Sequence, residues 1–86
     1  MLTIDPYAVE WRFVEGEVMA LDVARREYFA VNGSGTVLWT LLAASATEQQ
    51  LVEELRDTYD LPMEAAAVDV AGFLAQLRDR RLLVGG

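Results

Sequence analysis

The sequence predicts an α+β fold of the winged helix-turn-helix kind, in which a three-stranded antiparallel sheet is followed by three helices. Three observations predict it: alternating apolar and polar residues over the first third of the chain, a glycine-rich break at residues 32–35, and helical periodicity from there to about residue 80. The 86 residues are enough for one domain. We expect a single domain over residues 1–86, with an ordered core over about residues 7–84 and two frayed glycines at the end.

The first two strands are predicted as a hairpin. Residues 8–14 alternate in polarity, and one face consists of Val9, Trp11 and Phe13. Residues 15–17 suit a tight turn because they are polar around a glycine, which tolerates a positive φ. Residues 18–23 carry few charges, which favours the middle position in the sheet.

A short third strand is predicted at residues 28–31, after a polar turn at residues 24–27. One face of this strand carries Phe29 and Val31, and the other carries Tyr28 and Ala30. The strand contains no proline and no charge, so nothing in it protects a sheet edge from pairing with another chain.

The first helix is predicted over residues 36–44. The two glycines before it end the sheet, and Asn32 or Ser34 can cap the helix. The helix is apolar almost all round, which indicates that it is deeply buried, and we expect Trp39 to be a core residue.

A second helix is predicted from a capping box, with Thr47 as the N-cap and Gln50 reaching back to it. This helix runs to about residue 59, and its buried stripe is predicted to be Leu51, Val52, Leu55 and Tyr59. A proline at residue 62 is comfortable in the first turn of the helix that follows.

The third helix is predicted from about residue 62 to residue 80. Apolar residues recur at spacings of three and four, and the predicted core face is Met63, Ala66, Val70, Phe73 with Leu74, and Leu77. A second strip is smaller and partly polar, unlike a core face, and consists of Ala65, Asp69, Gly72 with Phe73, and Gln76. Residues 82–84 can close back on the sheet as a short strand.

Composition excludes several functions. There is no Cys and no His, which removes thiol nucleophiles, thiolate metal sites and imidazole bases, and we expect neither metal nor cofactor. The carboxylates at residues 53, 54 and 57 fit a solvated helix face, so we expect no enzyme. The net charge of −7 disfavours nucleic-acid binding. No apolar run approaches a membrane span and no signal peptide begins the chain, so we expect a cytoplasmic protein that does not bind membranes.

Residues 28–39 read Tyr-Phe-Ala-Val-Asn-Gly-Ser-Gly-Thr-Val-Leu-Trp and resemble the PqqD-like family, also called precursor-peptide recognition elements. The family's aliphatic-Asn pair and aliphatic-Trp pair are matched by residues 31–32 and 38–39. Residues 68–77 are similar to the family's last helix, and residues 82–84 to its closing aliphatic segment. The resemblance covers roughly residues 7–84. A departure is Val31, where Leu is commoner in the family.

The resemblance implies a non-catalytic domain that binds the leader segment of a ribosomally made precursor peptide. The short chain looks most like the discrete leader-binding protein of lasso-peptide clusters, which works beside a separate leader peptidase or modifying enzyme. The leader would add a strand beside the third strand and lie against the third helix. The peptide-binding residues that this implies are Tyr28, Phe29, Ala30, Val31, Ala65, Asp69, Gly72, Phe73 and Gln76.

Each of these roles has a simpler alternative. Tyr28 can cover the sheet, Phe29 and Phe73 can fill the core, and Asp69 can be an ordinary surface residue. Three arginines lie near the end of the third helix: Arg78, Arg80 and Arg81. Their positive charges either stabilise the helix by interacting with its dipole or contact acidic leader residues.

Other functions also remain open. A peptide chaperone of the pyrroloquinoline quinone biosynthesis type shares the mechanism and differs in cargo. A DNA-binding winged helix would need a basic recognition helix, whereas the third helix begins with acidic residues and Lys is absent. A dimerisation module can use the same open edge, and a small hydrolase lacks a pair of nucleophile and base.

Overall fold

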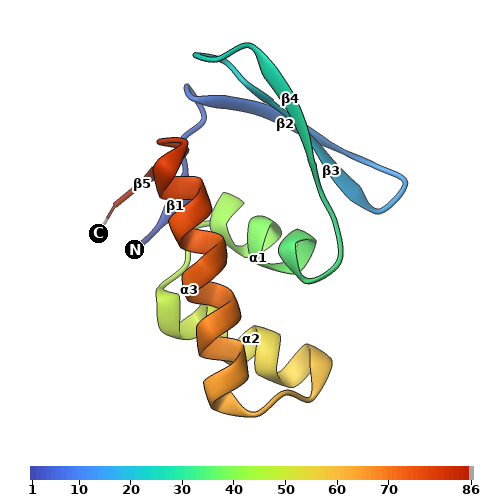
Figure 1. Ribbon diagram of the computed structural model, residues 1–86, viewed down its shortest axis with the longest axis vertical. Helices are drawn as coiled ribbons and strands as arrows, with labels where there is room; N and C mark the ends of the chain where they lie inside the picture. Colours follow the sequence, from blue (N-terminus) through green and yellow to red (C-terminus); the bar gives the residue numbers. More distant parts are fainter. Residues whose placement is uncertain (86) are drawn as a thin grey trace.

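The computed structural model describes residues 1–85, so Gly86, one of the two glycines expected to fray, lies outside the described residues. The elements are β1 (Thr3–Ile4), β2 (Val9–Val14), β3 (Glu17–Asp22), β4 (Glu27–Val31), α1 (Ser34–Ala43), α2 (Glu48–Tyr59), α3 (Met63–Asp79) and β5 (Leu83–Val84). The predicted α+β fold, a three-stranded antiparallel sheet followed by three helices, is confirmed. Figure 1 shows α1 beneath the sheet, α3 crossing beside α1, and α2 at the far end.

The sheet has the strand order β2-β3-β4, so β3 is the middle strand as predicted. Glu15 and Gly16 both have positive φ, 52° and 81°, which is the type I′ turn that matches the twist of a two-residue hairpin. The register pairs Ala20 with Trp11 on one side and with Phe29 on the other. Directly paired residues share a face, so these three side chains lie on the same side of the sheet, toward the helices.

Trp39 of α1 is the centre of the core, as predicted. Its side chain is fully buried, and its ring packs edge-on against Trp11 and Phe29 at centroid distances of 5.9 and 6.0 Å. The predicted cap of α1 is wrong. The N-cap is Gly33, with a φ of 58°, and neither Asn32 nor Ser34 makes a side-chain capping bond. The chain needs a left-handed residue to turn from β4 into α1, and glycine adopts it without steric cost.

The pair α2 and α3 forms the helix-turn-helix element. The capping box of α2 is present, since the Gln50 N–H donates to Thr47 Oγ1 at 3.1 Å and the Thr47 N–H donates to Gln50 Oε1 at 2.8 Å. Two residues of the predicted buried stripes are exposed instead: Tyr59 by 43% and Met63 by 46%. Both flank the α2–α3 turn, which lies at the end of the molecule farthest from the sheet, where no other element covers them (Figure 1).

The C-terminal strand does not join the main sheet, contrary to the prediction. β5 pairs antiparallel with β1, with Thr3 opposite Val84 and Ile4 opposite Leu83. The two-residue strand β1 was not predicted, because so short a segment shows no alternation. Leu2 and Ile4 are nonetheless buried in the core. No helix within residues 1–85 has the length and hydrophobicity needed to cross a membrane.

Candidate functional site

The outer edge of β4 presents main-chain groups that have no partner in the sheet. The residues that flank the two-residue turn at 15–16, Val14 and Glu17, form a hydrogen-bonded pair, and bonded and non-bonded pairs alternate from there along the β2–β3 ladder. Each β3 residue that does not bond to β2 bonds to β4 instead. The N–H and C=O groups of Phe29 and Val31 therefore point toward β3, and those of Tyr28 and Ala30 point away from it. Within residues 1–85, no loop or cap bond engages Tyr28 or Ala30. This edge can therefore accept another strand.

Two hollows, each of about 360 Å³, lie near this edge: the first between β4 and α3, and the second next to it, between α1 and α3. The first is lined by Phe29, Ala30, Val31, Asn32, Gly35, Phe73, Gln76, Leu77 and Arg80. The second is lined by Ser34, Leu38, Val68, Asp69, Gly72, Phe73 and Gln76. Since Phe73 and Gln76 line both, the two hollows adjoin each other, and we call them together the edge groove.

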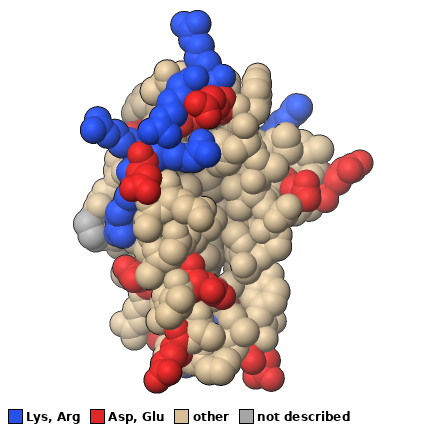
Figure 2. All heavy atoms as spheres, in the orientation of Figure 1, with Lys and Arg blue, Asp and Glu red and all other residues tan. Residues whose placement is uncertain are grey.

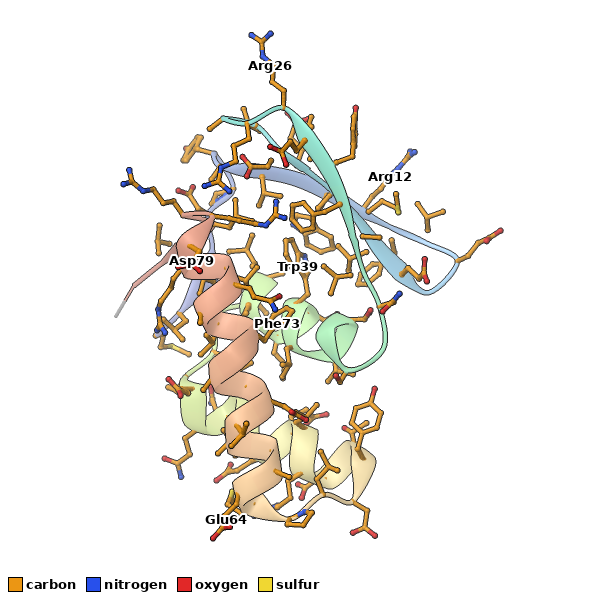
Figure 3. The ribbon with its side chains drawn as sticks, in the orientation of Figure 1. Arg12, Arg26, Trp39, Glu64, Phe73 and Asp79 are labelled. Carbon is orange, nitrogen blue, oxygen red and sulfur yellow. The ribbon has the colours of Figure 1, made fainter. Side chains whose placement is uncertain are left out.

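One wall of the edge groove is a stripe along α3. The lining residues 69, 72, 73, 76, 77 and 80 follow the spacings of three and four that bring side chains to one helix face. Figure 3 shows Phe73 projecting from α3 toward α1, with Trp39 below the sheet. The upper half of the groove is thus a gap between the edge strand and α3, the lower half is a gap between α1 and α3, and the Phe73 side chain lines both.

Gly35, the second residue of α1, allows this close approach. A Cβ built at Gly35 would lie 2.7 Å from Val31 Cγ1 and 3.2 Å from Phe73 Cε1. Carbon atoms prefer separations of about 3.5–4.0 Å, so a larger residue would displace both walls of the groove. Thr36 fixes the same junction, because its Oγ1 donates to the Val31 carbonyl oxygen at 3.1 Å.

The upper end of the edge groove contains a stacked aromatic and cationic pair. The Phe29 ring packs on Trp39 on one side, and the Arg80 guanidinium carbon lies 4.9 Å from its ring centroid. The Phe29 ring therefore contacts the core on one side and lines the groove on the other, where Arg80 at the end of α3 covers the ring.

The structure brings together most of the predicted peptide-binding residues. Seven line the edge groove: Phe29, Ala30, Val31, Asp69, Gly72, Phe73 and Gln76. Tyr28 does not. Its side chain is 78% exposed and lines a hollow of about 480 Å³ on the outer face of the sheet, together with Met19. Ala65 lines neither half of the groove, and Val68 occupies the end of the α3 wall instead.

Other groove residues were not singled out from the sequence. Arg80 was named there only with Arg78 and Arg81, as three arginines that either interact with the helix dipole or contact acidic leader residues. Arg80 alone lines the groove, and its continuation of the α3 spacing beyond Gln76 is the signal that distinguishes it. Gly35 and Asn32 stand in the predicted glycine-rich break, but only the packing of Phe73 against α1 assigns them to the groove. Within residues 1–85, no group of three His, Cys, Asp or Glu side chains is placed to hold a metal.

Comparisons with known proteins concern the family and the overall fold. The family model described as "Coenzyme PQQ synthesis protein D (PqqD)" matches residues 17–83. The solved structure "TbiB1 in Complex with the TbiA(beta) Leader Peptide" is similar, with 25% sequence identity, a TM-score of 0.88, and coverage of 98% of this chain and 96% of that chain. "Lasso peptide synthetase B1 complexed with the leader peptide" shares the fold at 15% identity, with a TM-score of 0.83 and 98% coverage of each chain. No curated protein matches the sequence.

Proposed function

Because the chain belongs to the coenzyme PQQ synthesis protein D (PqqD) family, we propose that it binds the leader segment of a ribosomally synthesised precursor peptide, of the lasso-peptide type. The likeness to TbiB1, a structure in complex with a leader peptide, supports the choice of ligand. The observation that carries the proposal is the unpaired edge of β4 beside the edge groove.

The leader binds by adding a strand to β4. The outward N–H and C=O groups of Tyr28 and Ala30 hydrogen-bond its backbone, which gives affinity with little dependence on sequence. Every second leader side chain then faces the edge groove, where Phe73 and Gln76 offer apolar and amide surface. The side chains between them face the outer side of the sheet, next to Tyr28.

The lower half of the edge groove selects by a different chemistry. Gly72 leaves room there, since a Cβ at its position meets no atom within 4 Å. Asp69 lines the same half and is exposed, so its carboxylate is free to accept a hydrogen bond from a leader hydroxyl or to pair with a leader cation.

The domain acts in the cytoplasm without catalysing a reaction, and it hands the bound leader to a separate leader peptidase or modifying enzyme. The absence of Cys and His from the sequence supports a role without catalysis. Ordering a flexible leader costs about 2–5 kcal/mol of the gross interaction. We therefore expect a Kd near micromolar, about −8 kcal/mol, which recruits the leader and still releases it.

The proposal is tested by fluorescence anisotropy, using the labelled leader of the precursor peptide encoded beside this gene and a scrambled peptide as control. Saturable binding near or below micromolar that scrambling abolishes is the expected result. Failure of the leader to bind at submillimolar protein would contradict the proposal. Delivery is tested separately, by measuring whether the domain accelerates leader removal by the neighbouring peptidase.

A second candidate is peptide presentation in pyrroloquinoline quinone biosynthesis, which the family description favours. It uses the same edge and differs in the peptide bound. Competition between the two types of leader for one labelled complex distinguishes them, because the cognate leader displaces the probe at lower concentration.

A further inference from the structure

Arg80 has no acidic partner among residues 1–85. Within residues 1–85, the one ion pair with a nitrogen–oxygen distance below 4.0 Å joins Arg56 and Asp57, at the opposite end of the helical half. Among the described residues Arg80 also finds no side-chain hydrogen-bond acceptor, and its Nη1 atom is shielded from solvent without a partner there. A shielded donor that lacks an acceptor is unfavourable, so this guanidinium gains from any acceptor that arrives with a ligand.

The side chain of Arg80 is held in place before any ligand arrives. It is half-buried, its guanidinium stacks over the Phe29 ring, and it lines the upper half of the edge groove. A stacked guanidinium keeps its planar set of donors in one orientation, which suits the two oxygens of a carboxylate. Partial removal of water around it strengthens its attraction to an anion.

The surroundings favour a negative group at the same end. Figure 2 shows basic side chains crowded over the sheet end of α3, while acidic side chains predominate over the other end. Arg25, from the β3–β4 turn, reaches this region and donates to the Asp79 carbonyl oxygen at 3.4 Å. A carboxylate seated at Arg80 therefore enters a basic neighbourhood within a protein whose net charge is −7.

We propose that Arg80 selects leaders that carry an Asp or Glu, whose carboxylate pairs with the guanidinium when that residue faces the edge groove beside Phe29. This inference rests on the proposed function and adds the chemistry of one leader position. It also separates Arg80 from Arg78, which is exposed at the end of α3 and lines neither half of the groove.

The edge groove then has opposite charges at its two ends, and this sets a spacing in the leader. Asp69 and Arg80 are eleven residues apart on one helix, about 16 Å along its axis. An extended peptide covers that length in about five residues, and side chains on one face recur every second residue. The leader acid and the hydroxyl or cation that meets Asp69 should therefore be four or six residues apart.

The test is a double-mutant cycle with the leader encoded beside this gene. Each leader Asp or Glu is changed singly to Asn or Gln, and each peptide is titrated against the wild type, Arg80→Gln and the matched control Arg78→Gln. We expect one leader substitution and Arg80→Gln each to weaken binding by about 10- to 100-fold, and the two together to weaken it no further. Arg78→Gln should change the Kd by less than about threefold.

The outcomes are distinguishable. If the wild type does not bind the leader, the proposed function fails and this inference fails with it. If the wild type binds but no acidic leader position is coupled to Arg80, the inference alone is overturned. Equal losses in Arg78→Gln and Arg80→Gln overturn it too, since they indicate general attraction. Thermal melts check folding, and the leader substitutions against the wild type decide the question if Arg80→Gln unfolds.

Discussion

Replacing Gly72 with alanine should make the domain more stable and its leader binding weaker. Gly72 lies in the interior of α3, where glycine is about 0.5–1 kcal/mol less favourable than alanine. A Cβ at this position meets no atom within 4 Å, so the new methyl group enters open space. At about 4–8 °C per kcal/mol for a domain of this size, Gly72→Ala should raise the Tm by about 2–8 °C.

The same open space is the lower half of the edge groove, so the methyl group stands where the proposed leader approaches α3. Intruding on a packed contact by one methyl typically costs about 1–3 kcal/mol. A loss at the lower end of that range is about 1.4 kcal/mol, or tenfold in Kd. Stability and affinity should therefore change in opposite directions.

The assay combines a thermal melt with the anisotropy titration, and Ala71→Gly is the matched control. Ala71 is the neighbouring residue of α3, is exposed, and lines neither half of the groove. Its substitution should lower the Tm by a similar amount and leave the Kd unchanged. A higher Tm with unchanged affinity for Gly72→Ala would show that the leader does not contact α3 there. A lower Tm for Gly72→Ala would show that the space around Gly72 is not open.

Three further predictions concern the edge, the groove and the core. Ala30→Pro removes an N–H that points away from β3, so it should abolish leader binding while circular dichroism shows that the sheet is kept. The control Ala30→Val keeps that N–H and should bind the leader normally. Leader binding by a folded proline variant would place the leader elsewhere. Asp69→Ala should weaken leader binding by about 1–3 kcal/mol with an unchanged melt, and an unaltered Kd would remove Asp69 from the site. Trp39→Ala should cost about 3–5 kcal/mol in urea denaturation because the side chain is fully buried, and normal stability would contradict its place in the core.

The elements that could be predicted from the sequence are those with local signals. The type I′ turn needs a residue such as Gly16, and the capping box of α2 needs the pair Thr47 and Gln50. Both can therefore be predicted from a few neighbouring residues, without knowledge of the tertiary structure. The strip from Asp69 to Gln76 was recognisable because the spacing of a helix face is fixed.

The remaining features depend on contacts between distant segments. The pairing of β1 with β5 joins the two ends of the chain, and neither strand is long enough to show a pattern. The roles of Gly35 and Arg80 follow from Phe73 and Phe29, which reach them only in the folded protein. Tyr28 was assigned to the site as part of a strand, but the pleat sends its side chain to the other face.

The pairing of β1 with β5 has a consequence for how this domain can be joined to other proteins. Thr3 lies opposite Val84, and Figure 1 shows β1 and β5 on the side of α3 away from β4. Polypeptide attached at either end therefore leaves from the same place and need not cross the β4 edge. The domain is suited to insertion into a loop of an enzyme, or to circular permutation through a short linker, with its peptide-binding edge still open.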